Sequence, residues 1–228
     1  MVNFLEDLCR AGVPAYAAVI AAVLTYFLGN INPAIIIGRA KGIDIRSQGS
    51  GNAGATNAMR SIGKKAGAVT FLIDVAKGFA GYTIPMVIFH EIPIALLCGL
   101  CVVLGHMYPV VFGFRGGKGV STTFGVLLAV SALYALVLLA IVLVLTVIFR
   151  RVSLSVMVAV AVAIILVFWG GYHQQFSFYK VGFMEFNVYL PMWIIIIMAL
   201  VVWKHRGNIG RLIKGQEPRL NFKGKGKG

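Results

Sequence analysis

The chain has 228 residues, of which 59% are hydrophobic and only 12% are charged, and its net charge at neutral pH is +14. Soluble domains are about a quarter charged, so this composition excludes an ordinary soluble protein and indicates an integral membrane protein. The apolar runs are continuous rather than alternating, which favours a helical bundle over a β-barrel. The excess of Lys and Arg suits anionic lipid headgroups and an anionic substrate better than nucleic acid.

Apolar runs long enough for membrane helices recur along the chain. A helical span needs about 20 apolar residues. The runs cover residues 11–37, 66–89, 92–112, 120–149, 152–169 and 189–203. Because they leave no room for a soluble domain, we expect one all-α, polytopic membrane domain over residues 1–220. The KGKGKG ending predicts a basic, disordered tail over residues 221–228.

Basic clusters predict the topology, because Lys and Arg gather in cytoplasmic loops. Such clusters stand at residues 39–65, 115–118, 150–151 and 204–227. The run at 120–149 begins and ends at two of these clusters, so it must cross the membrane an even number of times. It suits two short crossings hinged near residues 131–134, or a re-entrant pair, and we choose the two crossings. Seven transmembrane helices follow, with the N-terminus outside, the C-terminus in the cytoplasm and residues 170–187 in an outer loop.

A glycine-rich stretch, GSGNAGATNAMR at residues 49–60, follows the first apolar run and is flanked by Lys and Arg. Small residues let a backbone approach a ligand closely, and free N–H groups that lead into a helix can bind a phosphate. The glycines match the spacing of a dinucleotide-binding fingerprint, but that site needs a preceding strand. The alternative is a flexible cytoplasmic loop. The candidate binding residues are Arg46, Ser50, Asn52, Thr56 and Asn57.

A second glycine-rich turn, FRGGKGV at residues 114–120, lies between two apolar runs. It offers backbone N–H groups and the Lys118 ammonium to an anion at the membrane surface. It is not a Walker A loop, because Phe112 and Gly119 stand where that motif needs Gly and Ser or Thr. The candidate binding residues are Gly116, Gly117, Lys118 and Gly119.

A third polar segment, KHRGNIGRLIKGQEPRL at residues 204–220, follows the last apolar run. His205 and Asn208 are three residues apart, so they can share a helix face and reach a phosphate or hydroxyl together. Glu217 is expected to pair with a nearby Arg or Lys and to fix this segment. The alternative is a basic anchor for the last span.

Polar groups inside the apolar runs are assigned to structure. Asp74 and Lys77 stand three residues apart in one run, where charges usually face the protein interior and pair. His106 is expected to form a hydrogen bond between helices. The three cysteines lie in or beside apolar runs without a set of partners for a metal. We therefore expect no metal and no cofactor.

Three strings resemble, in order, the motifs of the bacterial acyl-phosphate:glycerol-3-phosphate acyltransferases, the PlsY family: IDIRSQGSGNAGATNAMR, GHMYPVVFGFRGGKGV and HRGNIGRLIKGQE. The resemblance covers most of residues 26–220. It implies a seven-span enzyme of the inner membrane with its active site at the cytoplasmic face. Such an enzyme transfers a fatty acyl group from acyl phosphate to the 1-hydroxyl of glycerol 3-phosphate, which yields lysophosphatidic acid and phosphate for phospholipid biosynthesis.

The resemblance also implies roles for individual residues. The expected catalytic residues are Arg46, Lys118, His205 and Asn208. The expected substrate-binding residues are Ser50, Asn52, Thr56, Asn57, Gly116, Gly117, Gly119, Ser153 and Glu217. The chain departs from the family where many members have a Ser in the first motif, since it has Asn30 or Asn32 there. Asparagine can bind phosphate but cannot be an acylated nucleophile.

Acyl phosphate is already activated, so an enzyme mainly has to bring the hydroxyl to the carbonyl and stabilise the oxyanion and the leaving phosphate. Arg46 and Lys118 are expected to hold phosphates. His205 is expected to act as general base or to bind phosphate, and a substrate phosphate is the alternative base. The enzyme that makes acyl phosphate is a candidate partner.

Two other functions compete with an acyltransferase. A membrane transporter of an organic phosphate predicts charges at the bilayer midplane and a two-fold internal repeat, and we find neither in the sequence. A lipid-binding scaffold would not need three glycine-rich or polar motifs on one face. We therefore prefer the enzyme, with membrane lipids around it and no nucleic acid as partner.

Overall fold

The computed structural model describes residues 12–172 and 189–220, and within them every regular element is a helix. The expected tail, most of the expected outer loop and Cys9 lie outside the described residues. The α-helices are α2 (Ala15–Asn30), α3 (Pro33–Ala40), α4 (Ala55–Ser61), α5 (Lys64–Phe89), α6 (Ile92–Met107), α7 (Val120–Val130), α8 (Ala132–Phe149), α9 (Val152–Tyr172), α10 (Tyr189–Lys204) and α11 (Arg206–Ile213). Two short 3-10 helices, η1 (Ile45–Ser47) and η2 (Val110–Phe112), lie in the connections.

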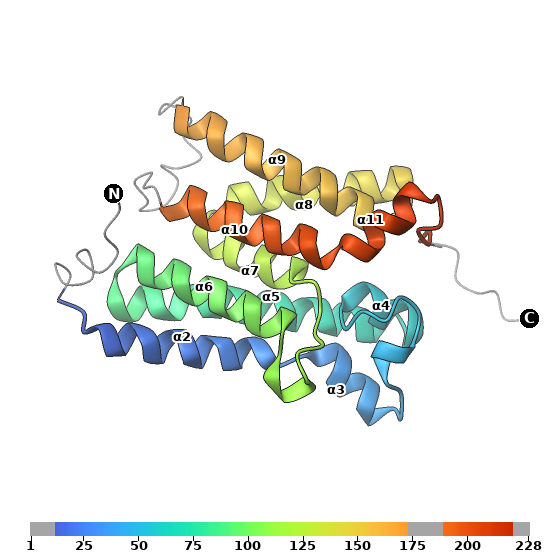
Figure 1. Cartoon of the computed structure of the whole chain (residues 1–228), viewed down its shortest axis with the longest axis horizontal. Helices are drawn as coiled ribbons and strands as arrows, with labels where there is room; N and C mark the ends of the chain where they lie inside the picture. The colour runs from blue at the N-terminus through green and yellow to red at the C-terminus, as the bar shows by residue number, and fades with distance from the viewer. Residues whose placement is uncertain (1–11, 173–188, 221–228) are drawn as a thin grey trace, which may run out of the picture.

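The long helices run side by side, and the short helices α3, α4 and α11 gather at one end of the bundle (Figure 1). Helix α5 packs against α6 and α7, α2 packs against α6, and α8 packs against α9. The main core lies between these helices and α10, where Val102, Val126 and Ile197 are fully buried. Many large apolar side chains on the outside stay exposed, as expected for helices that face lipid.

Hydropathy identifies membrane-crossing helices in the described part of the chain. Four segments are long and apolar enough, namely residues 15–40, 64–89, 92–112 and 132–149, and α10 with α11 adds a fifth if this bent pair counts as one span. Helix α7 and the part of α9 up to residue 168 are shorter apolar helices. The all-helical membrane architecture is thus confirmed, while the full set of seven spans and its orientation stays a prediction.

The first apolar run counts as one candidate span over residues 15–40, in keeping with the span expected over residues 11–37, but it is not one continuous helix. Helix α2 ends at Asn30, and α3 begins at Pro33. Pro33 stands at the first turn of α3, where its missing N–H is tolerated. Asn32 caps this helix, because its Oδ1 accepts a hydrogen bond from the Ile35 N–H at 3.1 Å. The cap and the proline together account for the break.

The long run at residues 120–149 is divided as predicted. Helix α7 ends at Val130, and α8 begins at Ala132. Ser131 caps α8, since its Oγ accepts a hydrogen bond from the Tyr134 N–H at 3.4 Å. The two helices pack against each other, so the expected hinge near residues 131–134 is confirmed.

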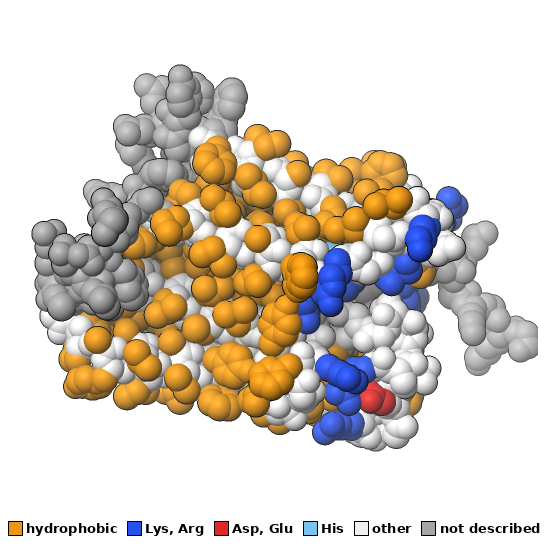
Figure 2. Space-filling model, in the orientation of Figure 1, with side chains coloured by type: hydrophobic (Ala, Val, Ile, Leu, Met, Phe, Trp, Pro, Cys, Tyr) orange, Lys and Arg blue, Asp and Glu red, His pale blue; other side chains and the backbone are white. Residues whose placement is uncertain are grey.

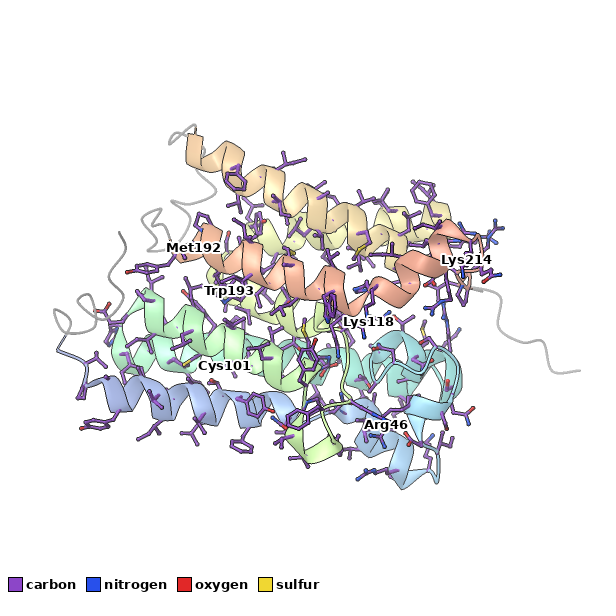
Figure 3. The ribbon with its side chains drawn as sticks, viewed as in Figure 1. Arg46, Cys101, Lys118, Met192, Trp193 and Lys214 are labelled. Atoms are coloured by element: carbon purple, nitrogen blue, oxygen red, sulfur yellow. The ribbon has the colours of Figure 1, made fainter. Side chains whose placement is uncertain are left out.

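Charge is unevenly distributed over the surface. The face in Figure 2 is apolar along most of the bundle, and its Lys and Arg side chains gather at the end that carries the short helices. Arg46, Lys118 and Lys214 lie toward this end, whereas Cys101 and Met192 lie along the apolar part (Figure 3). A ligand with an anionic head and an apolar tail matches this polarity.

Candidate functional site

One cavity joins the basic end of the bundle to its apolar interior. It has a volume of about 600 Å³ and is bordered by residues of α4, α5, α7, α8, α9, α10 and α11. Polar side chains line its basic end: Ser50, Asn52, Thr56, Asn57, Arg60, Lys64, Lys118, Ser153, His205, Asn208 and Glu217. Aliphatic side chains line the rest, among them Leu127, Leu138, Leu139, Val142, Leu143, Val156, Ala159 and Val160. The cavity therefore offers both an anion-binding region and a slot for an alkyl chain.

A hydrogen-bonded cluster connects three segments at the polar end. Lys118 Nζ donates to Asn208 Oδ1 at 2.5 Å. Asn208 Nδ2 in turn donates to Glu217 Oε1 at 2.6 Å, and Ser153 Oγ donates to the same oxygen at 2.7 Å. Arg211 Nε donates to Glu217 Oε2 at 2.8 Å, which confirms the expected pairing of Glu217 with a basic residue. The carboxylate thus fixes the amide that Lys118 contacts.

Burial and the neighbouring charges shift the pKa values of Lys118 and Glu217. Burial lowers the pKa of Lys118 to about 8, because the charged ammonium loses water; Arg211 and Arg60 add to this shift, and the attraction of Glu217 opposes it. For Glu217, burial acts to raise the pKa, but the hydrogen bonds from Ser153, Asn208 and Arg211 outweigh it, so the pKa lies below its usual value. Glu217 is therefore ionised at neutral pH.

His205 lies at the start of α11, where the chain bends by 58° after α10. The residue is 3% exposed and lines the cavity. The Nδ1 atom lies 2.8 Å from the Val201 carbonyl oxygen, so in the neutral ring Nδ1 carries the proton and Nε2 is the acceptor. Burial, together with the nearby Lys118, lowers the pKa of His205 to about 4. Above that pH the ring is a neutral acceptor rather than a phosphate-binding cation.

Glycine is required in the turn before Lys118. A side chain at Gly116 would overlap the His106 carbonyl oxygen, and one at Gly117 would overlap His106 Nε2. Gly119 has φ +81°, in the left-handed region, and lies against Met107. The turn therefore packs directly on the end of α6. Gly119 and Lys118 border the cavity, whereas Gly116 and Gly117 lie behind the lining residues.

The first glycine-rich stretch folds as expected into a loop followed by a helix, α4. Asn57 serves this loop, since its Nδ2 donates to the carbonyls of Ile45 and Gln48 at 3.0 and 2.9 Å. Its Oδ1 accepts from the Ser50 N–H at 2.9 Å. Asn57 therefore shapes the loop around Ser50. The sequence did not reveal this role, because its partners are backbone atoms.

Arg46 lies outside the cavity lining, beside Asp44 at the surface. Its Nη2 is 3.0 Å from Asp44 Oδ2, and its Nη1 donates to the Phe112 carbonyl at 3.3 Å. Hydrogen bonds from Arg46 lower the pKa of Asp44 to about 2. The guanidinium therefore links η1, which precedes the first glycine-rich stretch, to η2, which precedes the second.

Asn30 and Asn32, the two alternatives for the position where a family Ser was expected, both have hydrogen-bond partners. Asn30 Nδ2 donates to the Tyr26 carbonyl at 2.7 Å. Asn32 is fully buried, caps α3 and donates from Nδ2 to the Ala53 carbonyl at 3.1 Å. Asn32 therefore fixes the loop that precedes α4.

Two basic residues of the site were not among the candidates expected from the sequence. Arg60 and Lys64 line the cavity, and Arg60 Nη2 donates to the Pro218 carbonyl at 3.5 Å. Arg60 stands one helical turn after Thr56, and this spacing was the available signal. Among the described residues, no group of three or more His, Cys, Asp and Glu side chains could hold a metal ion.

Comparison with known proteins identifies close counterparts. The sequence profile of the glycerol-3-phosphate acyltransferase family matches residues 19–215. A glycerol-3-phosphate acyltransferase of Aquifex aeolicus (strain VF5) is 39% identical, and the match covers 89% of this chain and 99% of the relative. A glycerol-3-phosphate acyltransferase of Clostridioides difficile (strain 630) is also 39% identical, with coverage of 91% and 98%.

Two crystal structures share the fold as well. Both are of PlsY, an integral membrane glycerol 3-phosphate acyltransferase. Its glycerol 3-phosphate form has a TM-score of 0.80 and 39% sequence identity, and the match covers 90% of this chain and 96% of that one. Its lysophosphatidic acid form has a TM-score of 0.77 and 38% identity, with the same coverage.

Proposed function

The chain belongs to the glycerol-3-phosphate acyltransferase family, and we propose that it transfers a fatty acyl group from acyl phosphate to the 1-hydroxyl of glycerol 3-phosphate. The products are lysophosphatidic acid and inorganic phosphate, and the reaction serves phospholipid biosynthesis. One observation carries the proposal: a single cavity of about 600 Å³ has basic and polar groups at one end and aliphatic side chains at the other. Both proposed substrates carry a phosphate, and one carries a long alkyl chain.

The position of the cavity supports a cytoplasmic active site. Its polar end lies where Lys and Arg gather on the bundle (Figure 2), and such residues mark the cytoplasmic side of a membrane protein. We propose seven spans in the inner membrane: the four that length and hydropathy identify, the bent pair of α10 and α11, and the shorter helices α7 and α9. The N-terminus is then outside.

The proposed reaction needs positioned groups more than a protein nucleophile. The oxygen of the 1-hydroxyl attacks the acyl carbon, the bond between that carbon and the phosphate oxygen breaks, and phosphate leaves. Lys118, with Arg60 and Lys64 nearby, neutralises phosphate charge. The cavity walls bring hydroxyl and carbonyl together, which converts an encounter into an oriented reaction.

The hydroxyl proton has two candidate acceptors. His205 Nε2 is an acceptor in the neutral ring, because Nδ1 is turned to the Val201 carbonyl. We propose that Nε2 takes the hydrogen bond of the 1-hydroxyl; a substrate phosphate oxygen is the alternative base.

Arg46 is proposed to bind a phosphate as well. Its exposed ion pair with Asp44 contributes little, so exchanging Asp44 for a phosphate costs little.

Phosphate release tests the function directly. The purified protein in detergent or lipid cubic phase is given palmitoyl phosphate with and without glycerol 3-phosphate, and each assay is run with and without a chelator. Release that depends on glycerol 3-phosphate, with lysophosphatidic acid found by mass spectrometry, supports the acyltransferase. Saturable binding of glycerol 3-phosphate without release supports the transporter alternative instead. If phosphate is released without the chelator but not with it, the expected metal independence is wrong.

A further inference from the structure

A buried ion pair inside the bundle has no part in the reaction described so far. In α5, Asp74 Oδ1 lies 2.8 Å from Lys77 Nζ, and the side chains are 1% and 3% exposed. His106 of α6 joins them, with Nδ1 at 3.2 Å from Asp74 Oδ1 and 2.9 Å from Lys77 Nζ. The expected pair of Asp74 with Lys77 is thus confirmed, and His106 forms the expected contact between helices. Charged groups inside a membrane bundle are costly and usually carry a function.

Lys77 reaches from this pair to the break between α2 and α3. Its Nζ donates to the Gly29 carbonyl at 3.1 Å and to the Ile31 carbonyl at 2.5 Å. The last carbonyls of a helix lack hydrogen-bond donors within the helix, and here the Lys77 ammonium is their donor. Lys77 therefore fixes the irregular backbone on either side of Asn30.

Asn32 carries this connection to the first glycine-rich segment. It follows Ile31 directly, and its Nδ2 donates to the buried Ala53 carbonyl at 3.1 Å. Ala53 stands between Asn52 and Gly54, at the end of the loop that precedes α4 and borders the cavity. Lys77 is thus connected, through Ile31 and Asn32, to the loop at the polar end of the cavity.

His106 carries the connection to the second glycine-rich segment. Its carbonyl oxygen accepts from the Gly117 N–H at 3.1 Å. Its ring lies so close to Gly117 that no side chain fits between them. Gly117 immediately precedes Lys118, so the ring and carbonyl of His106 support the backbone that holds the ammonium. A side chain on Gly117 would also lie 3.0 Å from the Ala53 carbonyl, so the two segments meet at this point.

We propose that Asp74, Lys77 and His106 are positioning residues, which hold the segments at residues 50–57 and 116–119 in a fixed relation so that both can engage the substrates' phosphates. The inference rests on the proposed function for the identity of those substrates. Asp74 and His106 also border the cavity, whereas Lys77 does not. The positioning role requires no contact between these side chains and a reacting atom. They act through the backbone of Ile31 and Gly117 and through the side chain of Asn32.

The test uses two kinds of variant with one matched control. The double variant Asp74→Asn with Lys77→Met removes both charges together, because losing one partner would leave a buried charge unpaired. His106→Leu keeps the pair and removes the ring nitrogens, and His106→Asn restores a polar group close to the position of Nδ1. Thr70→Val is the control, since Thr70 is buried in the same helix and its Oγ1 has no hydrogen-bond partner in the described structure.

Three quantities are measured on each purified variant: thermal unfolding in detergent, KM and kcat with palmitoyl phosphate and glycerol 3-phosphate, and the rate of Lys118 acetylation by mass spectrometry. We expect a folded double variant whose KM for palmitoyl phosphate rises about tenfold, as for the loss of one good contact, with a smaller change in kcat. Lys118 should be acetylated faster, because its backbone is no longer fixed. His106→Leu should change KM and the acetylation rate in the same way as the double variant. His106→Asn should bring both quantities most of the way back to the wild-type values, and Thr70→Val should match the wild type.

A folded double variant with wild-type KM values and wild-type acetylation of Lys118 overturns the inference. A second outcome also overturns the inference: kcat falls in proportion to the loss of folded protein while KM stays unchanged. A pair with a purely structural role would produce that result. If the double variant does not fold, the comparison of His106→Leu with His106→Asn decides by the same two readouts. A wild type without phosphate release that depends on glycerol 3-phosphate refutes the proposed function, and the acetylation rates then still decide whether the cluster positions Lys118.

Discussion

Lys118 Nζ donates to Asn208 Oδ1 across 90 residues of sequence, and this bond joins the glycine-rich turn to α11 at the wall of the cavity. Asn208 is held in turn by Glu217, which accepts from its Nδ2 at 2.6 Å. The amide oxygen therefore has a fixed direction, and Lys118 has a hydrogen-bond acceptor before any substrate arrives. A phosphate can replace that neutral acceptor with a charged one, which is the stronger partner for an ammonium.

Replacing Lys118 tests whether this ammonium binds phosphate in the reaction. We expect Lys118→Ala to lower kcat/KM by roughly 10²–10³-fold, the effect of removing one positioned donor in an active site. The melting temperature should not fall, because the variant no longer buries a charge. Lys65→Ala is the control, since Lys65 is exposed on α5 at the same end of the bundle. Wild-type turnover of Lys118→Ala would remove Lys118 from the site.

The pH dependence of kcat/KM should report the same group. Burial lowers the pKa of Lys118 to about 8, so in the free enzyme the ammonium is charged below that pH and loses its proton above it. Binding of anionic substrates should therefore weaken, and kcat/KM should fall, as the pH rises through about 8. Glu217 favours the charged form, whereas Arg211, Arg60 and Lys204 disfavour it.

Lys118→Arg separates this titration from that of the substrate. Arg stays charged throughout the range, so the fall in kcat/KM near pH 8 should disappear in the variant even if its activity is lower. Because both proteins meet the same substrate ionisation, the ratio of the two profiles isolates Lys118. An unchanged alkaline limb would assign the titration to another group.

His205 should act as a neutral acceptor, and its substitution distinguishes this role from phosphate binding. Its pKa of about 4 means that the ring is uncharged at pH 6–8. We expect His205→Phe to lower kcat by about 10²-fold, in the range of general-base catalysis, with KM for glycerol 3-phosphate little changed. Steady-state kinetics of both substrates measures this. A large rise in KM at constant kcat would show phosphate binding, and full activity would leave the substrate phosphate as the base.

Glu217 should contribute more to stability than to chemistry. Its buried carboxylate accepts hydrogen bonds from Ser153, Asn208 and Arg211, and loss of such a partner leaves buried donors unpaired at a cost of about 2 kcal/mol. Glu217→Ala should therefore lower the thermal unfolding temperature in detergent. Glu91→Ala is the control, because Glu91 makes no capping hydrogen bond at the start of α6. Equal melting temperatures for both variants would contradict the structural role.

Hydropathy and local chemistry were sufficient to predict most of the fold. Apolar runs located the long helices, and Ser131 divided the longest run as expected. The break between α2 and α3 was missed, although Pro33 and the capping Asn32 both signal a helix start, because both lie inside one apolar run. A hydropathy window averages over such a break.

The site was predictable where a motif displays its chemistry and not where tertiary contacts decide. Lys118, His205 and Asn208 all border one cavity. Arg46 is paired with Asp44 outside the lining, and Asn57 shapes its own loop. Side chains that act through backbone carbonyls leave no sequence pattern, because every residue has such a carbonyl. The link from Lys77 to Ile31 is of this kind.

The apolar part of the cavity should set which acyl chains are accepted. Ala159 of α9 is 7% exposed and lines this part of the cavity. A larger side chain there takes the space of terminal methylenes, and each methylene excluded from an apolar site costs about 0.8 kcal/mol, or roughly fourfold in kcat/KM. We therefore expect Ala159→Phe to reduce kcat/KM for palmitoyl phosphate more than for a decanoyl donor, with KM for glycerol 3-phosphate unchanged. Ala129→Phe on α7, outside the cavity lining, is the control. Equal losses with both donors would place the acyl chain elsewhere, because a chain that runs past Ala159 must be discriminated there by length.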